Sequence, residues 1–132
     1  MGQEESELHS NPRVQVIRAS EAKSRPLADE RGTLQPIPLP DSHSEIDVHV
    51  ISLKAGSRDG PFHYHSTAEN LYYVLEGTLR LRLAGGDVEA SAGDAVWIPA
   101  GLAHGVSVGS SPARLLEVYW PAPADYVVVP ES

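Results

Sequence analysis

From residue 45 onward, apolar and polar residues alternate along the chain with a period of two. The segment IDVHV at 46–50 has this pattern, which is typical of a strand with one face toward a core. The segment TLRLRLA at 78–84 repeats it, with leucines on one face and arginines on the other. The segments AVWIPA, AHGVSV and ARLLEVYW predict further strands, because each is short, rich in apolar residues and bounded by Pro or Gly.

Turn residues separate these segments and indicate how they connect. AGGD at 84–87 predicts a hairpin, and EGT at 76–78 predicts a tight connection. No stretch after residue 44 has a sustained helical period, and the 11 Gly and 11 Pro favour short strands over long helices. Seven or eight short strands at this spacing predict an all-β sandwich or barrel.

The first third of the chain has a weaker pattern. Residues 1–12 are polar and predict a disordered tail, so that residues 13–132 would form a single domain. Within that domain, residues 14–17 predict a short first strand and residues 20–31 a loop or weak helix. The segment QPIPLP at 35–40 predicts an extended, proline-stiffened connector.

Composition and charge exclude several classes of function. The chain of 132 residues has a formal net charge of −8, which argues against nonspecific nucleic-acid binding. The absence of cysteine excludes disulfides and thiolate metal sites, so any metal must be held by nitrogen and oxygen. The sequence contains no run of 18 apolar residues, which a membrane span would need, and its first residues do not resemble a secretory signal. We therefore expect a cytoplasmic protein with no nucleic-acid or membrane partner.

Two histidines one residue apart stand out in the segment PFHYHSTAENLYYVLEG at 61–77. On a strand, His63 and His65 would point to the same face about 6.5 to 7 Å apart. Two imidazoles at that separation can converge on one cation, since a zinc–nitrogen bond is about 2.0 to 2.1 Å long. An isolated pair of this kind also fits two ordinary core histidines.

A second segment, GDAVWIPAGLAHGVSV at 93–108, favours the metal site over two core histidines. Together the two segments resemble the two signature motifs of the cupin superfamily. The matching residues are Gly56, His63, His65, Gly77, Gly93, Pro99, Gly101 and His104. The resemblance covers about residues 45–120. It implies a cupin-type antiparallel jelly-roll β-barrel in which His63, His65 and His104 bind one divalent ion, whether zinc, nickel, iron or manganese.

The chain departs from the family pattern at the usual glutamate ligand. Counting back six residues from Gly77 reaches Asn70, whereas Glu69 has the expected spacing after His65. Adjacent strand residues face opposite sides, so only one of the two can enter the site without a bulge. We expect Asn70 to be the fourth ligand, with Glu69 as the alternative. Two smaller departures are the six residues between Gly56 and His63, and Val108 in place of an asparagine.

A neutral ligand set would leave a divalent ion its full charge, which favours an anionic or enolisable small-molecule substrate. Alternation places Tyr72 on the inner face, and we predict that Tyr72 or a bound water moves the proton. Phe62, Trp97 and Trp120 are further candidates for the pocket wall, although Trp97 also fits the core.

Three functions remain open from the sequence. The first is a metal-dependent enzyme that carries out non-redox chemistry on a small oxygen-rich molecule, as an isomerase, cyclase or lyase. The second is an iron- or manganese-dependent dioxygenase that uses the same three histidines. The third is a ligand- or sugar-binding protein without activity. The resemblance also implies a homodimer, for which QPIPLP is the predicted exchanged arm.

Overall fold

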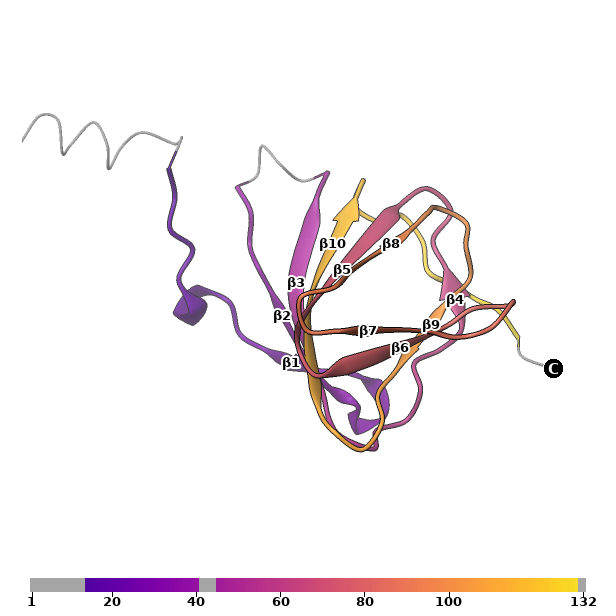
Figure 1. Cartoon of the computed structure of the whole chain (residues 1–132). Helices are drawn as coiled ribbons and strands as arrows, with labels where there is room; N and C mark the ends of the chain where they lie inside the picture. Colours follow the sequence, from indigo (N-terminus) through magenta and orange to yellow (C-terminus); the bar gives the residue numbers. More distant parts are fainter. Residues whose placement is uncertain (1–13, 41–44, 131–132) are drawn as a thin grey trace, which may run out of the picture.

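Short β-strands form nearly all the regular structure of the protein (Figure 1). The computed structural model describes residues 14–40 and 45–130. Within these residues there are eleven strands and two single 3-10 turns. The strands are β1 (Arg25–Pro26), β2 (Gly32–Pro36), β3 (Asp47–Leu53), β4 (His63–Tyr64), β5 (Glu69–Glu76), β6 (Thr78–Arg82), β7 (Val88–Ser91), β8 (Ala95–Ile98), β9 (Gly105–Ser107), β10 (Ala113–Trp120) and β11 (Val127–Val128). The turns are η1 (Ala19–Glu21) and η2 (Ala28–Glu30).

The strands form one large sheet and two small ones. The large sheet has the order β1-β2-β3-β10-β5-β8, and its strands pair antiparallel throughout. The sheet β7-β6-β9 lies opposite it, and the pair β11-β4 lies at one end (Figure 1). This arrangement confirms the predicted all-β, antiparallel jelly-roll barrel.

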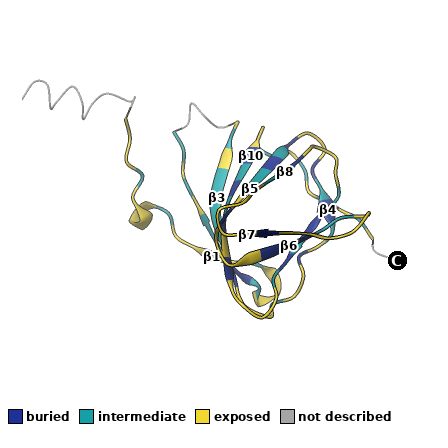
Figure 2. Cartoon of the chain, viewed as in Figure 1, coloured by how far each residue is buried: buried dark blue, intermediate teal, exposed yellow. Residues whose placement is uncertain are grey.

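Alternation along the strands places one face of each sheet inside the barrel. Along β10 every second residue is buried, and β5 buries Asn70, Tyr72 and Val74 in the same way (Figure 2). From the opposite sheet, Leu79 and Leu81 of β6 complete the apolar core. Burying one such leucine stabilises the fold by roughly 1.5 to 3 kcal/mol.

The tight connections are built as the sequence predicts. Gly77 joins β5 to β6 with φ of 79°, and a Cβ atom there would stand 2.3 Å from the carbonyl oxygen of Pro112. Only glycine satisfies both conditions. The residues after β6 turn through AGGD and return as β7, which pairs antiparallel with β6.

Several expectations for the first part of the chain differ from the structure. Residues 14–17 form no strand and are largely exposed, because no neighbouring strand lies beside them (Figure 1). Residues 20–31 hold the end of η1, all of η2, and the short strand β1. The segment QPIPLP begins as the end of β2, and Ile37 N donates to Val48 O of the same chain (2.8 Å). The predicted tail, residues 1–12, lies outside the described residues.

The tryptophans also differ from expectation. Trp97 and Trp120 are 55% and 58% exposed, so neither belongs to the core or to the inner wall. Both lie on the outer face of the large sheet, because Trp97 pairs with Leu71 and Trp120 with Glu69, on the face opposite Asn70. In the described part of the chain no helix is long and apolar enough to cross a membrane.

Candidate metal centre

Two segments that are far apart in the sequence bring the three motif histidines together. His63 lies on β4, His65 follows it by two residues, and His104 immediately precedes β9. The backbones of His63 and His104 form an antiparallel bridge, in which each amide N donates to the other residue's carbonyl oxygen at 2.9 and 2.8 Å. The main chain itself therefore fixes how the two motifs face each other.

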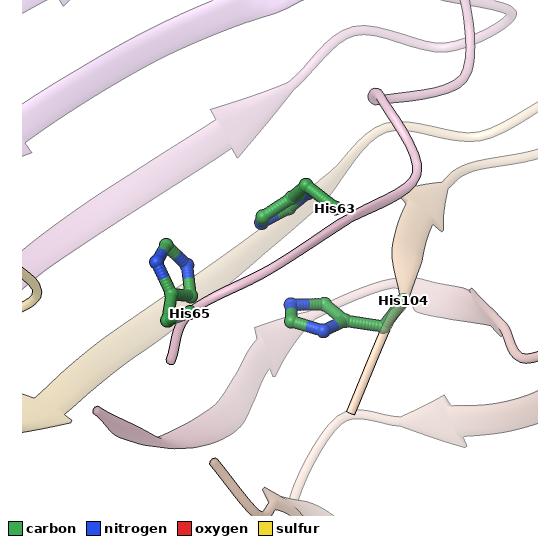
Figure 3. Close-up of side chains that lie close together, drawn as sticks. All are labelled: His63, His65 and His104. Carbon is green, nitrogen blue, oxygen red and sulfur yellow. The ribbon is translucent and has the colours of Figure 1, made fainter. Parts of the chain in front are cut away.

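The side chains of His63, His65 and His104 converge inside the barrel (Figure 3). One nitrogen of each ring lies within 4.8 Å of a nitrogen of the other two. The three residues are buried, with exposed fractions of 8%, 4% and 1%. Three imidazoles in this arrangement can converge on a single ion. We refer to them as the histidine triad.

Hydrogen bonds to backbone carbonyls set the tautomer of every ring in the triad. The Nδ1 atoms of His63, His65 and His104 lie 2.8, 2.7 and 2.9 Å from the carbonyl oxygens of Pro61, Asp125 and Leu102. A carbonyl can only accept, so each Nδ1 carries the proton and each Nε2 presents a lone pair. The Nε2 atoms of His65 and His104 are buried and have no hydrogen-bond partner among the described residues. A ring whose Nδ1 is bonded to a carbonyl and whose Nε2 is free is characteristic of histidines that bind metals.

Burial keeps His63 and His104 uncharged near neutral pH. The pKa of His63 is lowered from 6.5 to about 4, mainly by desolvation and to a smaller extent by the neighbouring imidazoles of His104 and His65. Desolvation likewise lowers the pKa of His104. Neutral imidazoles are the form that binds a metal ion, so these two histidines need not release a proton when an ion binds.

Asn70 is buried on the inner face of β5, whereas Glu69 is only half-buried. The amide Nδ2 of Asn70 donates to Glu117 Oε2 at 3.2 Å. Its Oδ1 is buried and has no partner among the residues described. Because Nδ2 is held by Glu117, the amide oxygen is left available to a ligand.

Glu117, on β10, is a buried carboxylate that the sequence analysis did not single out. It is 4% exposed and is hydrogen-bonded to His49 Nε2 on the adjacent strand β3. Burial by itself would raise its pKa, but hydrogen bonding and charge interaction with His49, and hydrogen bonds from Tyr119 and Asn70, lower it overall. Glu117 is therefore ionised at neutral pH. Its position between Leu115 and Tyr119 in an alternating strand was the signal that could have identified it.

A cavity of about 280 Å³ lies against the triad. His63 is the triad residue at its wall, and Tyr72, Glu117 and Tyr126 also line it. The predicted residue Tyr72 is buried and lines this cavity while it packs in the core. Burial raises the pKa of its hydroxyl, and the negative charge of Glu117 raises it further, so Tyr72 stays protonated.

The segment after β10 lies against the triad. The sequence analysis did not identify it. The ring of Tyr126 stacks on that of His63, with centroids 4.0 Å apart and planes 14° apart. Asp125 accepts from the ring of His65 through its carbonyl and from the backbone N of Ser66 through its carboxylate. This short segment therefore orients two of the three rings.

Comparison with known proteins agrees with this geometry. Residues 49–119 match the family model for the cupin domain. The chain belongs to the cupin family. No curated protein sequence matches it.

Solved structures of other cupin-like proteins share its fold. The polyketide cyclase RemF from Streptomyces resistomycificus is 25% identical with a TM-score of 0.75, over 90% of this chain and 87% of that one. A predicted oxalate decarboxylase from Thermotoga maritima is 24% identical with a TM-score of 0.68, over 82% and 100%. A sugar phosphate isomerase from Silicibacter pomeroyi is 24% identical with a TM-score of 0.66, over 83% and 77%. The last two similarities are evidence for the cupin fold alone.

Proposed function

We propose that the histidine triad binds one divalent metal ion and that this cupin is an enzyme acting on a small oxygen-rich molecule by non-redox chemistry. The observation that carries the proposal is the set of three converging imidazoles, each with Nδ1 bonded to a backbone carbonyl. Zinc, nickel, iron and manganese all accept such ligands.

Asn70 supplies the fourth protein ligand in this proposal. Its unpartnered, buried Oδ1 supports the assignment, and the bond from Nδ2 to Glu117 fixes the orientation of the amide. Glu69 is on the other face of β5. A set of four neutral ligands leaves the ion its full charge, which favours anionic or enolisable substrates.

An ion held by the triad would polarise a carbonyl oxygen and stabilise negative charge that develops on it. The chain's own residues would then move the proton. Glu117 is ionised, buried and at the cavity wall, so its carboxylate can accept a proton from a carbon next to that carbonyl. Tyr72 remains protonated beside it and can donate a hydrogen bond to the substrate. Glu117 thus acts as the general base, and Tyr72 acts as a hydrogen-bond donor to the substrate.

The polyketide cyclase, which is 25% identical to this chain, supports a reaction of this kind. The test begins with protein purified without a histidine tag, whose metal content is measured by mass spectrometry. The metal-loaded protein is then incubated with pyruvate in D2O, and loss of the methyl proton signal is followed by NMR. We expect metal-dependent exchange that Glu117→Gln slows by about 10²- to 10⁴-fold. No bound metal, or exchange unchanged in Glu117→Gln, would contradict the proposal.

Oxygen consumption separates this function from a dioxygenase. The iron-loaded protein is mixed with the same enolisable probe, pyruvate, in an oxygen electrode. Non-redox chemistry predicts proton exchange with no uptake of oxygen, whereas substrate-dependent uptake would favour the dioxygenase.

We also propose a homodimer formed through the outer face of the large sheet. Apolar side chains cover this face, since they alternate with the inward residues of β3, β10, β5 and β8. They are Val48, Val50, Leu71, Tyr73, Leu75, Trp97, Leu116, Val118 and Trp120. An exposed apolar face of this extent favours burial against a second copy.

Light scattering at micromolar concentration tests the homodimer. We expect a dimeric mass for the wild type and a monomeric mass for Trp97→Lys. Val88→Lys serves as the control, because Val88 is 45% exposed but lies on the opposite sheet. A monomeric wild type would contradict the dimer.

A further inference from the structure

Arg31 lies at the wall of the cavity that adjoins the triad, between η2 and β2. Its backbone is held on both sides, since Arg31 N donates to Ala28 O and Arg31 O accepts from Lys54 N. Its guanidinium packs against the backbone of Gly60, where a Cβ atom would stand only 2.7 Å from Arg31 Nη2. The absence of a side chain at Gly60 therefore makes room for this cation.

Three other arginines, Arg80 and Arg82 on β6 and Arg114 on β10, each lie near a carboxylate, whereas Arg31 does not among the described residues. Arg80, Arg82 and Arg114 lie 3.8, 3.7 and 3.2 Å from carboxylate oxygens of Glu89, Asp59 and Glu76. Within residues 14–40 and 45–130, no carboxylate lies within ion-pair distance of Arg31. Its Nε is buried without a hydrogen-bond partner in the same part of the chain. A buried donor of this kind normally has an acceptor.

Arg31 and the triad face the same space. Arg31, His63 and Tyr126 all line the cavity, and the ring of Tyr126 stacks on that of His63. Burial raises the pKa of the Tyr126 hydroxyl, and the positive charge of Arg31 opposes that rise. Glu117 lies beyond ion-pair distance of Arg31, and its carboxylate is hydrogen-bonded to His49 and Asn70. Arg25 adds a second, exposed positive charge to the wall. The cavity wall thus holds two arginines together with the imidazole of His63.

We propose that Arg31 is the binding site for an anionic group of the substrate, a carboxylate or a phosphate, whose carbonyl end lies at the triad. This inference rests on the proposed function and narrows the substrate to a small molecule with two functional ends. A guanidinium suits this role, because its planar set of donors matches the oxygens of a carboxylate or phosphate. The protein's net charge of −8 repels anions at long range, so a local cation is needed to hold one.

Matched probes test the site by calorimetry on the zinc-loaded protein. 2-Oxoglutarate and 2-oxopentanoate share the same keto-acid end, but only the first has a distal carboxylate. 2-Oxo-4-phosphonobutanoate carries a phosphonate at that place and separates a phosphate site from a carboxylate site. We expect one of the two dianions to bind the wild type about ten- to a hundredfold more tightly than 2-oxopentanoate. Arg31→Gln should abolish that difference, and Arg31→Lys should restore part of it.

Arg58→Gln is the control variant, because Arg58 is exposed and does not line the cavity, yet its loss changes the net charge equally. It should keep the preference for the dianion. Equal binding of all three probes by the wild type, or a preference that survives Arg31→Gln, would overturn the Arg31 site while leaving the metal and the proposed chemistry intact.

A second measurement does not depend on the metal. In zinc-free protein, the Nε–H resonance of Arg31 should shift on addition of glutarate or phosphate, and the Nε–H resonance of Arg58 should not. A shift of Arg31 in protein whose triad binds no metal would support the anion site even though the proposed function had failed. No shift of Arg31 would count against the site.

Discussion

Two polar clusters lie inside the same barrel, and they are satisfied in different ways. In the histidine triad, the Nδ1 atoms are bonded to backbone carbonyls, and the Nε2 atoms of His65 and His104 have no partner. In the second cluster, Glu117 is bonded to His49 and Asn70, so both carboxylate oxygens are engaged. The triad lies at β4 and β9 of the two small sheets, whereas Glu117, His49 and Asn70 lie on strands of the large sheet.

The difference shows which cluster is complete without a ligand. A buried polar atom that lacks a partner costs about 1 to 3 kcal/mol. In the triad, the Nε2 atoms of His65 and His104 carry that cost, and binding an ion would relieve it. The Glu117 cluster has no such deficit at its carboxylate, so it stabilises the fold and keeps a charged base in place. Substitutions in the two clusters should therefore have different consequences.

The largest effect is expected on metal binding. His104→Ala should remove nearly all bound zinc, because it deletes a ligand and opens the geometry, whereas His49→Gln should retain it. The zinc content of both variants, measured by mass spectrometry after dialysis, checks this expectation. Stoichiometric zinc in His104→Ala would show that the triad is not the site.

The second effect concerns the stability of the metal-free protein. Glu117→Leu should lower the free energy of unfolding by about 2 to 3 kcal/mol, because it leaves His49 and the amide of Asn70 without their acceptor. Adding His49→Leu should recover part of this loss. Urea denaturation of Glu117→Leu, His49→Leu and the double variant measures these changes. A double variant as unstable as the sum of the single ones would mean that the pair is not coupled.

The third effect is the pH dependence of stability in chelator-treated protein. The pKa of His63 is about 4 in the folded state and 6.5 when unfolded. Between these values the unfolded chain binds a proton that the folded chain does not, so stability is complete above pH 6.5 and falls as the pH is lowered toward 4. The total loss is about 2 kcal/mol, allowing for solvent at the cavity wall.

Urea denaturation at pH 7 and pH 5 measures this slope, before protonation of Glu117 and other carboxylates adds its own loss. His104 contributes in the same direction, since its pKa is also lowered. His63→Gln should reduce the slope. A wild type equally stable at pH 7 and pH 5 would show that the triad is not desolvated.

The smallest effect separates the two candidates for the fourth ligand. Asn70→Ala should weaken zinc binding about tenfold, because water can replace one amide oxygen, and Glu69→Ala should leave it unchanged. Competition with a zinc indicator measures both affinities. The reverse order of effects would assign the ligand to Glu69.

The sequence predicted the parts of the fold and site that depend on short-range pattern. Alternation identified the strands that became β3, β6 and β10, and the inward face of β5 followed from counting back from Gly77. The sequence also predicted that His63, His65 and His104 lie close together, since both motifs place their histidines at inward positions.

Features that depend on which segments become neighbours could not be predicted in the same way. Residues 14–17 have a strand-like composition but no partner strand. Trp97 is apolar but lies on the outer face, which only the pairing of β8 with β5 reveals. Arg31 and Tyr126 lie outside the region that resembles the cupin motifs, and the fold brings them to the cavity from either end of that region.

The backbone bridge between His63 and His104 has a consequence for redesign of the chain. Because the two motifs are joined directly at the site, the hairpin that links β6 to β7 is not needed to set their spacing. The tip of that hairpin, around Gly85 and Gly86, is exposed. An inserted peptide or a fused reporter domain at this tip should leave the metal centre intact, which makes the hairpin a natural place to attach a fluorescent sensor of metal occupancy.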